Sequence, residues 1–394
     1  MTHAYLLQRR RLIGAGVIAL MAPTLGNARD RGAHARFEGL DTFVAEQMRQ
    51  ASIPGLALGV ASNGAVRFVQ GYGHADIEQR RPVTTETMFH IASVTKTVTA
   101  TAIMQLVDAG RLSLDEAVAG YLDFPLRNPH HPDVSITFRH LLMHTSSISD
   151  ANYYAIDFRQ RGRDSTIPLA EFLKDYLAPG GRAYSRDTCF SQDMPGAAWD
   201  YSNVGYGLLG YLASRIAGQD MREQTREKIF RPLGMGHTSW TISGTPATLG
   251  ATPFDDVDGV LGAVEPVGFP DWSTGMLRSS IGDFTRFVAA SANGGVFGNA
   301  RIASGAAMAQ MLTMHTPPKL PDWLSGQGLG WVASRLDGRD MPNHWGGDPG
   351  VFTAVYVDPP TRTGVAIFTN ATVSAARKTA VKNIASRLLG NRQR

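Results

Sequence analysis

Apolar residues recur with helical and strand-like spacing at both ends of the chain. Residues 38–51 place apolar side chains on one face of a helix, namely Leu40, Phe43, Val44, Met48 and Ala51. Two strand-like runs follow and flank Asn63-Gly64, a dipeptide that favours a tight β-hairpin. Residues 351–370 predict two more strands around a proline-rich turn, and residues 373–389 predict an amphipathic helix. We therefore expect both ends to supply strands together with a covering helix.

The sequence between these ends, roughly residues 93–320, has helical patterns separated by many Gly, Pro and Asn turns. The pattern predicts an α+β fold, in which an antiparallel sheet is built from both chain termini and flanked by helices, with an inserted, mostly helical lobe. We assign residues 36–92 together with 325–394 to the sheet lobe, and residues 93–324 to the mainly helical lobe. No internal repeat or low-complexity tract interrupts this organisation.

The N-terminus has the pattern of an export signal. Three arginines, Arg9 to Arg11, precede an apolar run of eleven residues from Leu12 to Ala22. Such a run is shorter than the roughly 20 residues of a membrane-spanning helix. We assign residues 1–28 to a signal peptide, although later small residues would allow cleavage near residue 35. The paired arginines resemble a twin-arginine signal.

A cleaved leader predicts a periplasmic or secreted protein with no stable membrane span, whereas an uncleaved one would leave it tethered to the inner membrane. Cleavage after Ala28 would also remove three of the 38 basic residues and none of the 34 acidic ones, so the net charge of +4 belongs largely to the leader. The rest of the chain has no basic stripe, which argues against a nucleic-acid partner. A single cysteine, Cys189, excludes an intrachain disulfide and a cysteine-rich metal site. The sequence gives no indication of an oligomeric state.

Ser93 and Lys96 lie three positions apart in the mostly apolar segment 89–110. The pattern predicts a helix from about Val94 to Ala109, so Ser93 would lie at its N-terminus with Lys96 on the same face. A serine hydroxyl becomes a good nucleophile only when a neighbouring group takes its proton. For lysine to do so, its pKa must fall from about 10.4 towards 7, which costs roughly 4 kcal/mol and requires burial. Taken alone, the spacing favours a capping serine beside a surface lysine.

Two further motifs supply groups suited to the same chemistry. Tyr201-Ser202-Asn203 lies between a Pro-Gly turn and a predicted helix, and His344-Trp345-Gly346 lies at the start of a predicted strand. A phenol can relay a proton to a leaving group, and an asparagine amide can hold a substrate carbonyl. A glycine in the strand lets substrate approach the backbone, where an N–H group can stabilise an oxyanion.

Ser-x-x-Lys, Tyr-x-Asn and His-x-Gly, in this order, resemble the serine β-lactamase and penicillin-binding-protein superfamily. The similarity is to its class C-like branch, which includes DD-peptidases, D-aminopeptidases and carboxylesterases. It covers nearly all of the chain after the leader, because further segments also match: residues 71–76, 112–122, 136–148, 273–287 and 328–331.

The resemblance implies a cofactor-free, metal-free hydrolase whose substrate is a small molecule or a peptide. It implies that Ser93 is the nucleophile, Lys96 its activating partner and Tyr201 the general base or acid. The expected substrate contacts are Asn203, His344, Trp345, Gly346 and Gly347, with the backbone N–H groups of residues 93 and 347 forming the oxyanion hole. For Trp345, a wall of the substrate pocket and a purely packing role are both open.

Two departures from the family pattern affect the expected substrate. His344 stands where many family β-lactamases have a lysine that attracts the substrate carboxylate, and histidine is mostly neutral at pH 7. We therefore expect cleavage of an ester or amide bond through an acyl-serine intermediate. The alternatives are a true β-lactamase or DD-peptidase acting on β-lactams or peptidoglycan peptides, and a penicillin-binding or sensor module that is acylated without turnover. The second departure is Ser147, where the family often has glycine.

Structural roles are also considered for several other histidine and tyrosine side chains. His130 and His131 lie in a proline-bounded loop, and the pair His140 and His144 lacks a third metal ligand nearby, so solvated, core or capping roles are expected. Tyr153 and Tyr154 could border the cleft or simply pack.

Overall fold

The computed structural model of the protein describes residues 37, 39–257 and 260–390. The described residues from Leu40 onwards form one compact unit. The predicted signal peptide lies outside the described residues, so residues 1–28 and their cleavage stay a prediction. Within the described ranges, no helix is long and apolar enough to cross a membrane.

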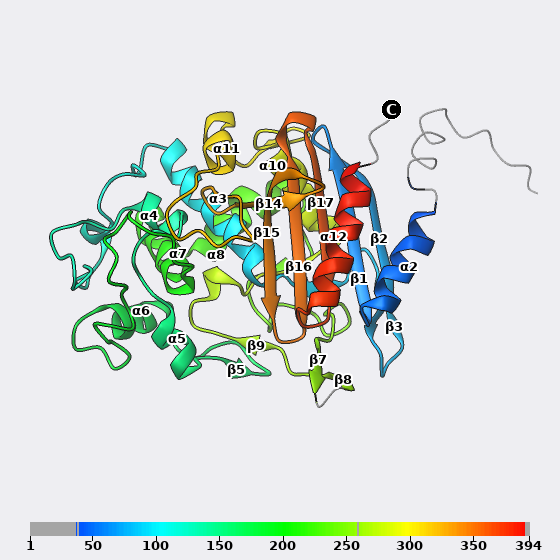
Figure 1. The fold of residues 1–394 in the computed structure, drawn as a ribbon, viewed down its shortest axis with the longest axis horizontal. Coiled ribbons are helices and arrows are strands. Elements are labelled where there is room, and N and C mark those ends of the chain that lie inside the picture. Colours follow the sequence, from blue (N-terminus) through cyan, green and yellow to red (C-terminus); the bar gives the residue numbers. More distant parts are fainter. Residues whose placement is uncertain (1–36, 38, 258–259, 391–394) are drawn as a thin grey trace, which may run out of the picture. The chain divides into compact units, whose positions relative to one another are not determined.

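An antiparallel eight-stranded sheet dominates the fold (Figure 1). Its strands in spatial order are β13 (Gly326–Gln327), β14 (Val332–Leu336), β15 (Arg339–Asp348), β16 (Val351–Asp358), β17 (Thr363–Thr369), β1 (Gly55–Ser62), β2 (Ala65–Asp76) and β3 (Arg81–Pro82). Strands from the two ends of the chain pair with each other, with Leu56 of β1 opposite Thr369 of β17. The predicted α+β fold with a sheet built from both ends is therefore confirmed. The division into lobes at residues 92 and 325 stays a prediction.

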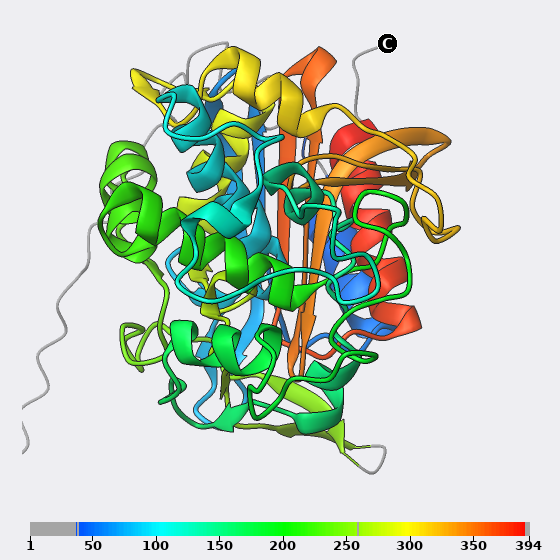
Figure 2. The ribbon, with the colours of Figure 1, turned by 90° about the vertical axis from the view of Figure 1, so that its left-hand side faces the viewer.

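Helices cover both faces of this sheet. On one face, α12 (Ala375–Gly390) packs against β17 and against α2 (Leu40–Gln50), while α10 (Ile281–Ala292) covers β1 and β17 from the opposite face (Figure 2). The close approach of α10 depends on glycine, because a Cβ on Gly59 of β1 would overlap the Thr285 hydroxyl oxygen of α10. Strands β16 and β17 are buried along their whole length, as expected for strands with both faces covered.

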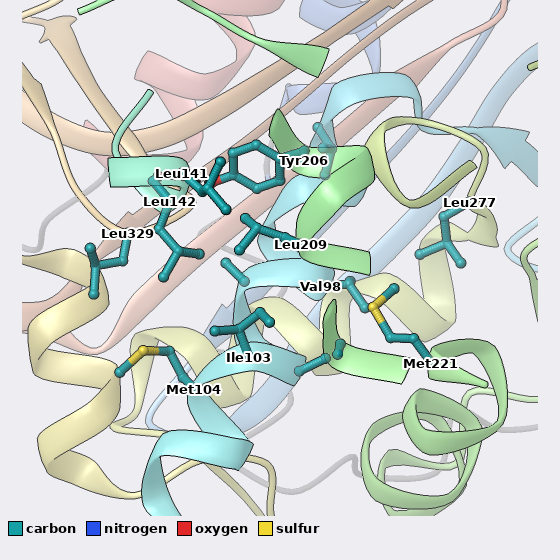
Figure 3. Packing of buried hydrophobic residues seen from close by; sticks show 14 of the residues in the cluster. Val98, Ile103, Met104, Leu141, Leu142, Tyr206, Leu209, Met221, Leu277 and Leu329 are labelled. Carbon is teal, nitrogen blue, oxygen red and sulfur yellow. Dashed lines mark hydrogen bonds between the residues drawn. The ribbon is translucent and has the colours of Figure 1, made fainter. Parts of the chain in front are cut away.

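The largest helical core surrounds α3 (Thr95–Asp108), in which most residues are buried. In Figure 3, Val98 and Ile103 of α3 lie among side chains such as Leu209 of α7 (Asn203–Ala217) and Leu142 of α4 (Phe138–Leu142). The remaining α-helices of the described residues are α5 (Ala151–Ile156), α6 (Leu169–Leu177), α8 (Met221–Thr225), α9 (Arg231–Leu233) and α11 (Gly305–Leu312). The predicted helix 94–109 thus agrees with α3 to within one residue at each end.

Short strands pair outside the main sheet. A three-stranded sheet contains β4 (Met88–His90), β10 (Arg278–Ser280) and β6 (Thr238–Ser239), with β10 in the centre. Three two-stranded pairs are β5 (Gln160–Arg161) with β9 (Val267–Gly268), β7 (Phe254–Val257) with β8 (Val260–Ala263), and β11 (Val296–Phe297) with β12 (Ala300–Arg301). Strand β4 leads directly into the segment that carries Ser93.

The backbone at Ser147 has a conformation that suits the glycine expected there from the resemblance. Ser147 has a φ of 64°, in the left-handed region that glycine adopts at the least cost. The hydroxyl of Ser147 accepts a hydrogen bond of 2.8 Å from Asn128 Nδ2, which offsets part of that cost.

We expect the Ser147→Gly variant to be more stable than the Ser147→Ala variant by about 1 kcal/mol, because both lose the hydroxyl but only alanine keeps the left-handed strain. Chemical denaturation of the two variants measures the difference. An alanine variant as stable as the glycine variant would contradict this explanation.

Candidate active site

Ser93 lies on a one-turn 3₁₀ helix (Ala92–Val94) between β4 and α3, and not on α3 itself. The preceding residue, Ala92, has a φ of 45°, a left-handed conformation that costs of order 1 kcal/mol or more and often occurs at functional sites. The sharp bend turns the chain from the strand into the helix. It leaves Ser93 partly exposed at a cavity of about 310 Å³, which Tyr201, Asn203 and Gly347 also line.

Lys96 is fully buried beside Ser93. Its Nζ donates hydrogen bonds to Ser93 Oγ at 3.2 Å, to Asn203 Oδ1 at 2.7 Å and to the Thr274 carbonyl oxygen at 2.9 Å. A protonated lysine has three donors, so these acceptors use all of them. The ammonium is therefore held in one position with one N–H aimed at the serine oxygen.

The pKa of Lys96 is lowered to about 8, mainly because burial disfavours the charged form. Three carboxylates, Asp271, Asp150 and Asp348, act in the opposite direction and keep the pKa from falling further. At pH 7 about a tenth of the lysine is then the neutral amine, which can accept a proton from Ser93.

This pKa predicts the pH dependence of activity. Because the neutral amine is the active base, kcat/KM for an uncharged substrate is expected to rise up to about tenfold per pH unit below 8 and to level off above it. Initial rates between pH 6 and 9.5 measure the profile, with a substrate that has no titratable group. A flat profile across this range would exclude Lys96 as the base.

Tyr201 is the second group at the serine oxygen. The Ser93 side chain is near enough to act on the pKa of Tyr201 as a hydrogen-bond partner, and the Tyr201 ring centroid lies 4.9 Å from Lys96 Nζ. Burial raises the pKa of Tyr201 well above its ordinary value, and Asp150 and Asp348 add to this, although the Ser93 hydrogen bond opposes it. The phenol therefore stays protonated at neutral pH, which suits a proton donor and relay better than a resting base.

His144 holds the Tyr201 ring in place. The two rings stack with centroids 4.3 Å apart, and His144 Nδ1 accepts the Ser202 backbone N–H at 3.1 Å. Burial lowers the pKa of His144 well below its ordinary value, so the ring is neutral and carries its proton on Nε2. The core role expected for this histidine agrees with these contacts. In the part of the chain that the structure describes, no cluster of three or more His, Cys, Asp or Glu side chains could hold a metal ion.

Asn203 is fixed by its place at the first turn of α7. Asp150 accepts hydrogen bonds from the backbone N–H groups of Asn203 and Val204 and from the Ser202 hydroxyl, at the positive end of the helix dipole. The Asn203 side chain then donates to the Tyr154 hydroxyl at 2.9 Å while its Oδ1 accepts from Lys96. One carboxylate thus positions the amide that in turn positions the lysine.

Strand β15 passes close to Ser93, and only glycine allows this approach. A Cβ on Gly346 would lie 2.3 Å from the Ile91 carbonyl oxygen and 3.0 Å from the Ser93 nitrogen. His344 is buried next to Lys96, and both effects lower the pKa of His344 to about 3, which makes the ring neutral at pH 7. Gly347 lines the Ser93 cavity.

Trp345 and His344 line a different, adjacent cavity of about 230 Å³, which Tyr201 also borders. The Trp345 ring stacks on Trp323 at 6.1 Å and donates from Nε1 to the Tyr356 hydroxyl at 2.9 Å. These contacts are consistent with a packing role for Trp345. A substrate contact for Trp345 or His344 therefore stays a prediction, as does the oxyanion hole at residues 93 and 347.

Several residues of the cavity were not predicted as site residues. Asp348, Arg159, Phe158 and Phe269 line it together with Tyr153 and Tyr154. Asp271 is also buried here; it accepts hydrogen bonds from Tyr153 and Thr274 and so orients the turn whose carbonyl holds Lys96. Of these, Asp348 had a usable sequence signal, because it follows Gly346 by two positions and alternate residues of a strand share a face.

The family model described as "Beta-lactamase" matches residues 40–389. The chain belongs to the β-lactamase family. This confirms the resemblance predicted from the three motifs. Penicillin-binding protein 4 of Amycolatopsis lactamdurans is 30% identical over 357 residues, which cover 86% of this chain and 85% of that protein. Esterase EstB of Burkholderia gladioli is 30% identical over 255 residues, covering 63% of this chain and 61% of that protein.

The chain matches a smaller part of another relative. Protein flp of Staphylococcus aureus (strain COL) is 30% identical over 202 residues, so the chain spans only 38% of the length of that relative and 51% of its own. Among solved structures, the octameric penicillin-binding protein homologue from Pyrococcus abyssi superposes with a TM-score of 0.72 and 26% identity, covering 90% of this chain and 77% of that one.

Proposed function

We propose that this member of the β-lactamase family hydrolyses an ester or amide bond through an acyl intermediate on Ser93. The observation that carries the proposal is the buried Lys96, whose Nζ lies 3.2 Å from Ser93 Oγ and whose pKa is lowered to about 8. Such a lysine can take the serine proton near neutral pH, which an exposed lysine cannot.

In the proposed mechanism, the neutral amine of Lys96 takes the Ser93 proton as Oγ attacks the substrate carbonyl carbon. The oxyanion formed would be stabilised by the backbone N–H groups of Ser93 and Gly347. Tyr201 donates its proton to the leaving alcohol or amine and recovers one from Lys96, so the bond to the leaving group breaks and the acyl-serine remains. Water then attacks the acyl group by the reverse proton transfers, which regenerates Ser93 and releases the acid.

The neutral His344 supports esters and amides over β-lactams as substrates. A protonated lysine at this position would attract a substrate carboxylate, whereas a histidine with a pKa of about 3 offers no charge at pH 7. The similarity to a protein named as an esterase is consistent with this choice. We further propose that the protein acts in the periplasm or outside the cell, on the basis of the leader pattern in residues 1–28.

A substrate panel with mass spectrometry tests the proposal. Short p-nitrophenyl esters, D-alanyl peptides and a chromogenic cephalosporin are incubated with the protein and with the Ser93→Ala variant. Sustained turnover of esters or peptides and a transient acyl adduct on the Ser93 peptide, both absent from the variant, are expected. Fast cephalosporin turnover would instead indicate a β-lactamase, and a stable adduct without further product would indicate a module that is only acylated.

A further inference from the structure

Asp348, near the end of β15, lines the same cavity as the nucleophile Ser93. Side chains two apart on a strand share a face, and the face of Gly346 is the one that lies against the Ser93 nitrogen. Asp348 is therefore on the same face as that contact, and it lines the cavity that Ser93 and Tyr201 also line. Asp348 is thus part of the wall of the cavity in which a substrate is expected to bind.

In the part of the chain that the structure describes, the Asp348 carboxylate accepts no hydrogen bond and pairs with no charged side chain. The nearest basic group is His90 Nε2 at 3.7 Å, but this nitrogen donates its proton to the Gly275 carbonyl oxygen at 2.6 Å, and burial lowers the pKa of His90 to about 3. Within the described ranges, no lysine or arginine nitrogen lies within 4.0 Å of Asp348. The Asp348 side chain is 22% exposed, so a ligand that enters the cavity can reach the carboxylate and supply the hydrogen-bond donor that it lacks.

The other carboxylates near the site accept hydrogen bonds, and in this they differ from Asp348. Asp150 accepts three hydrogen bonds at the start of α7, and Asp271 accepts from Tyr153 and Thr274. Asp157 binds the Arg159 guanidinium through two hydrogen bonds of 2.6 and 2.9 Å. None of these three is free to take a ligand, whereas Asp348 is.

The charged groups around Asp348 are largely engaged elsewhere. Burial raises the pKa of Asp348 to about 7, while Lys96, Arg159 and Arg278 lower it and Asp271 raises it. Arg159 is paired with Asp157, and Arg278 donates to the backbone carbonyl oxygen of Met276. A cation that entered the cavity would favour the carboxylate form and would find it without a competing ion pair.

We propose that Asp348 binds a protonated amino group on the substrate, so that the enzyme prefers acyl groups bearing an ammonium over neutral or anionic ones. This inference rests on the acyl transfer proposed for Ser93. A carboxylate accepts short, charge-assisted hydrogen bonds from an ammonium. The rings of Tyr153, Tyr154 and Phe158 line the same cavity and provide aromatic surface, which also favours a cation. The specific substrate class is an aminoacyl ester or amide.

Two substrates of matched shape test the preference. Alanyl p-nitroanilide, in both D and L forms, has an ammonium where isobutyryl p-nitroanilide has a methyl group. We expect the protein to favour one alanyl form over the isobutyryl compound in kcat/KM by at least about tenfold, and the Asp348→Asn variant to lose this preference by about tenfold to hundredfold. Because Asp348 also acts on the pKa of Lys96, the quantity compared is the ratio of the two kcat/KM values, in which an effect common to both substrates cancels.

Asp340→Asn is the matched control. Asp340 lies on the same strand and the substitution removes the same charge, but its side chain is exposed in an ion pair with Arg335 at 3.6 Å. The control is expected to keep the alanyl preference. An Asp348→Asn variant that slows both substrates equally would give Asp348 a merely structural role and would overturn the inference, as would an absence of alanyl preference in the unmodified protein.

The outcomes separate this inference from the proposed function. If Ser93 turns over the isobutyryl compound and the protein shows no preference for an alanyl form, only the proposed role of Asp348 is contradicted. If neither anilide nor the ester panel acylates Ser93, both proposals fail. Should Asp348→Asn not fold, competition in the unmodified protein decides the question. Alaninamide is then expected to inhibit at least about tenfold more strongly than isobutyramide, and equal inhibition overturns the inference.

Discussion

Replacing Lys96 by methionine is expected to lower kcat/KM by about 10³- to 10⁴-fold, the upper part of the range for a lost general base. Methionine has a similar length and suits a fully buried site, but it cannot accept the Ser93 proton. The change also leaves Asn203 Oδ1 and the Thr274 carbonyl oxygen without their donor, so a loss of stability of about 2 kcal/mol is expected as well. Steady-state rates on a p-nitrophenyl ester and chemical denaturation measure the two effects.

Lys96→Arg provides the matched control for this prediction. Arginine keeps a positive charge and hydrogen-bond donors, but it does not deprotonate near neutral pH. If Lys96 acts as a base, the arginine variant loses about as much activity as the methionine variant. An arginine variant close to the unmodified protein would mean that only the charge matters, which contradicts the proposed mechanism.

Tyr201→Phe is expected to lower kcat by about 10²- to 10³-fold for substrates with poor leaving groups, because the phenol is the proton donor to the leaving group. The loss is expected to be much smaller for p-nitrophenyl esters, since p-nitrophenolate leaves without a proton. Phenylalanine keeps the ring that stacks on His144, so the fold around the site is retained. Rates on an alkyl ester or amide and on a p-nitrophenyl ester with the same acyl group give the comparison.

Tyr206→Phe is the matched control for Tyr201. The Tyr206 ring is also buried near Lys96, at 5.6 Å from Nζ, but its hydroxyl donates to the Leu142 carbonyl oxygen. Its loss is expected to cost about 1 kcal/mol of stability and little activity. Equal losses for both tyrosine variants, or equal losses of Tyr201→Phe on both esters, would remove the role of Tyr201 as proton donor.

Helix α3 and the residues around it were predictable because their signals are local. The spacing of Ser93 and Lys96, the helical pattern after them and the Asn63-Gly64 turn each depend on a few consecutive residues. The structure places Ser93, Lys96, Tyr201 and Asn203 close together, and their catalytic roles stay a prediction. The one-turn 3₁₀ helix under Ser93 was not predicted, since it depends on the left-handed Ala92.

The carboxylates that tune the site were not predicted as part of it. Asp150, Asp271 and Asp348 come from three distant segments and act together on the pKa of Lys96. Aspartate is common on protein surfaces, so its presence alone does not indicate burial. Only the tertiary arrangement shows that Asp150 and Asp271 are buried and that Asp348 lines the cavity, and only the hydrogen bonds show that Asp348 lacks a donor. The order of strands within the sheet is also a long-range property that no local pattern contains.

The place of β17 has a consequence for how the chain is made. This strand lies between β16 and β1, with Thr369 opposite Leu56, so the β1–β2 hairpin leaves the ribosome long before the neighbour that completes it. During synthesis β1 presents an unpaired apolar edge, which is the kind of surface that misassembles. We therefore expect the sheet to close only after residues 363–369 have been synthesised, and nascent chains that stall earlier to depend on chaperones that shield this edge.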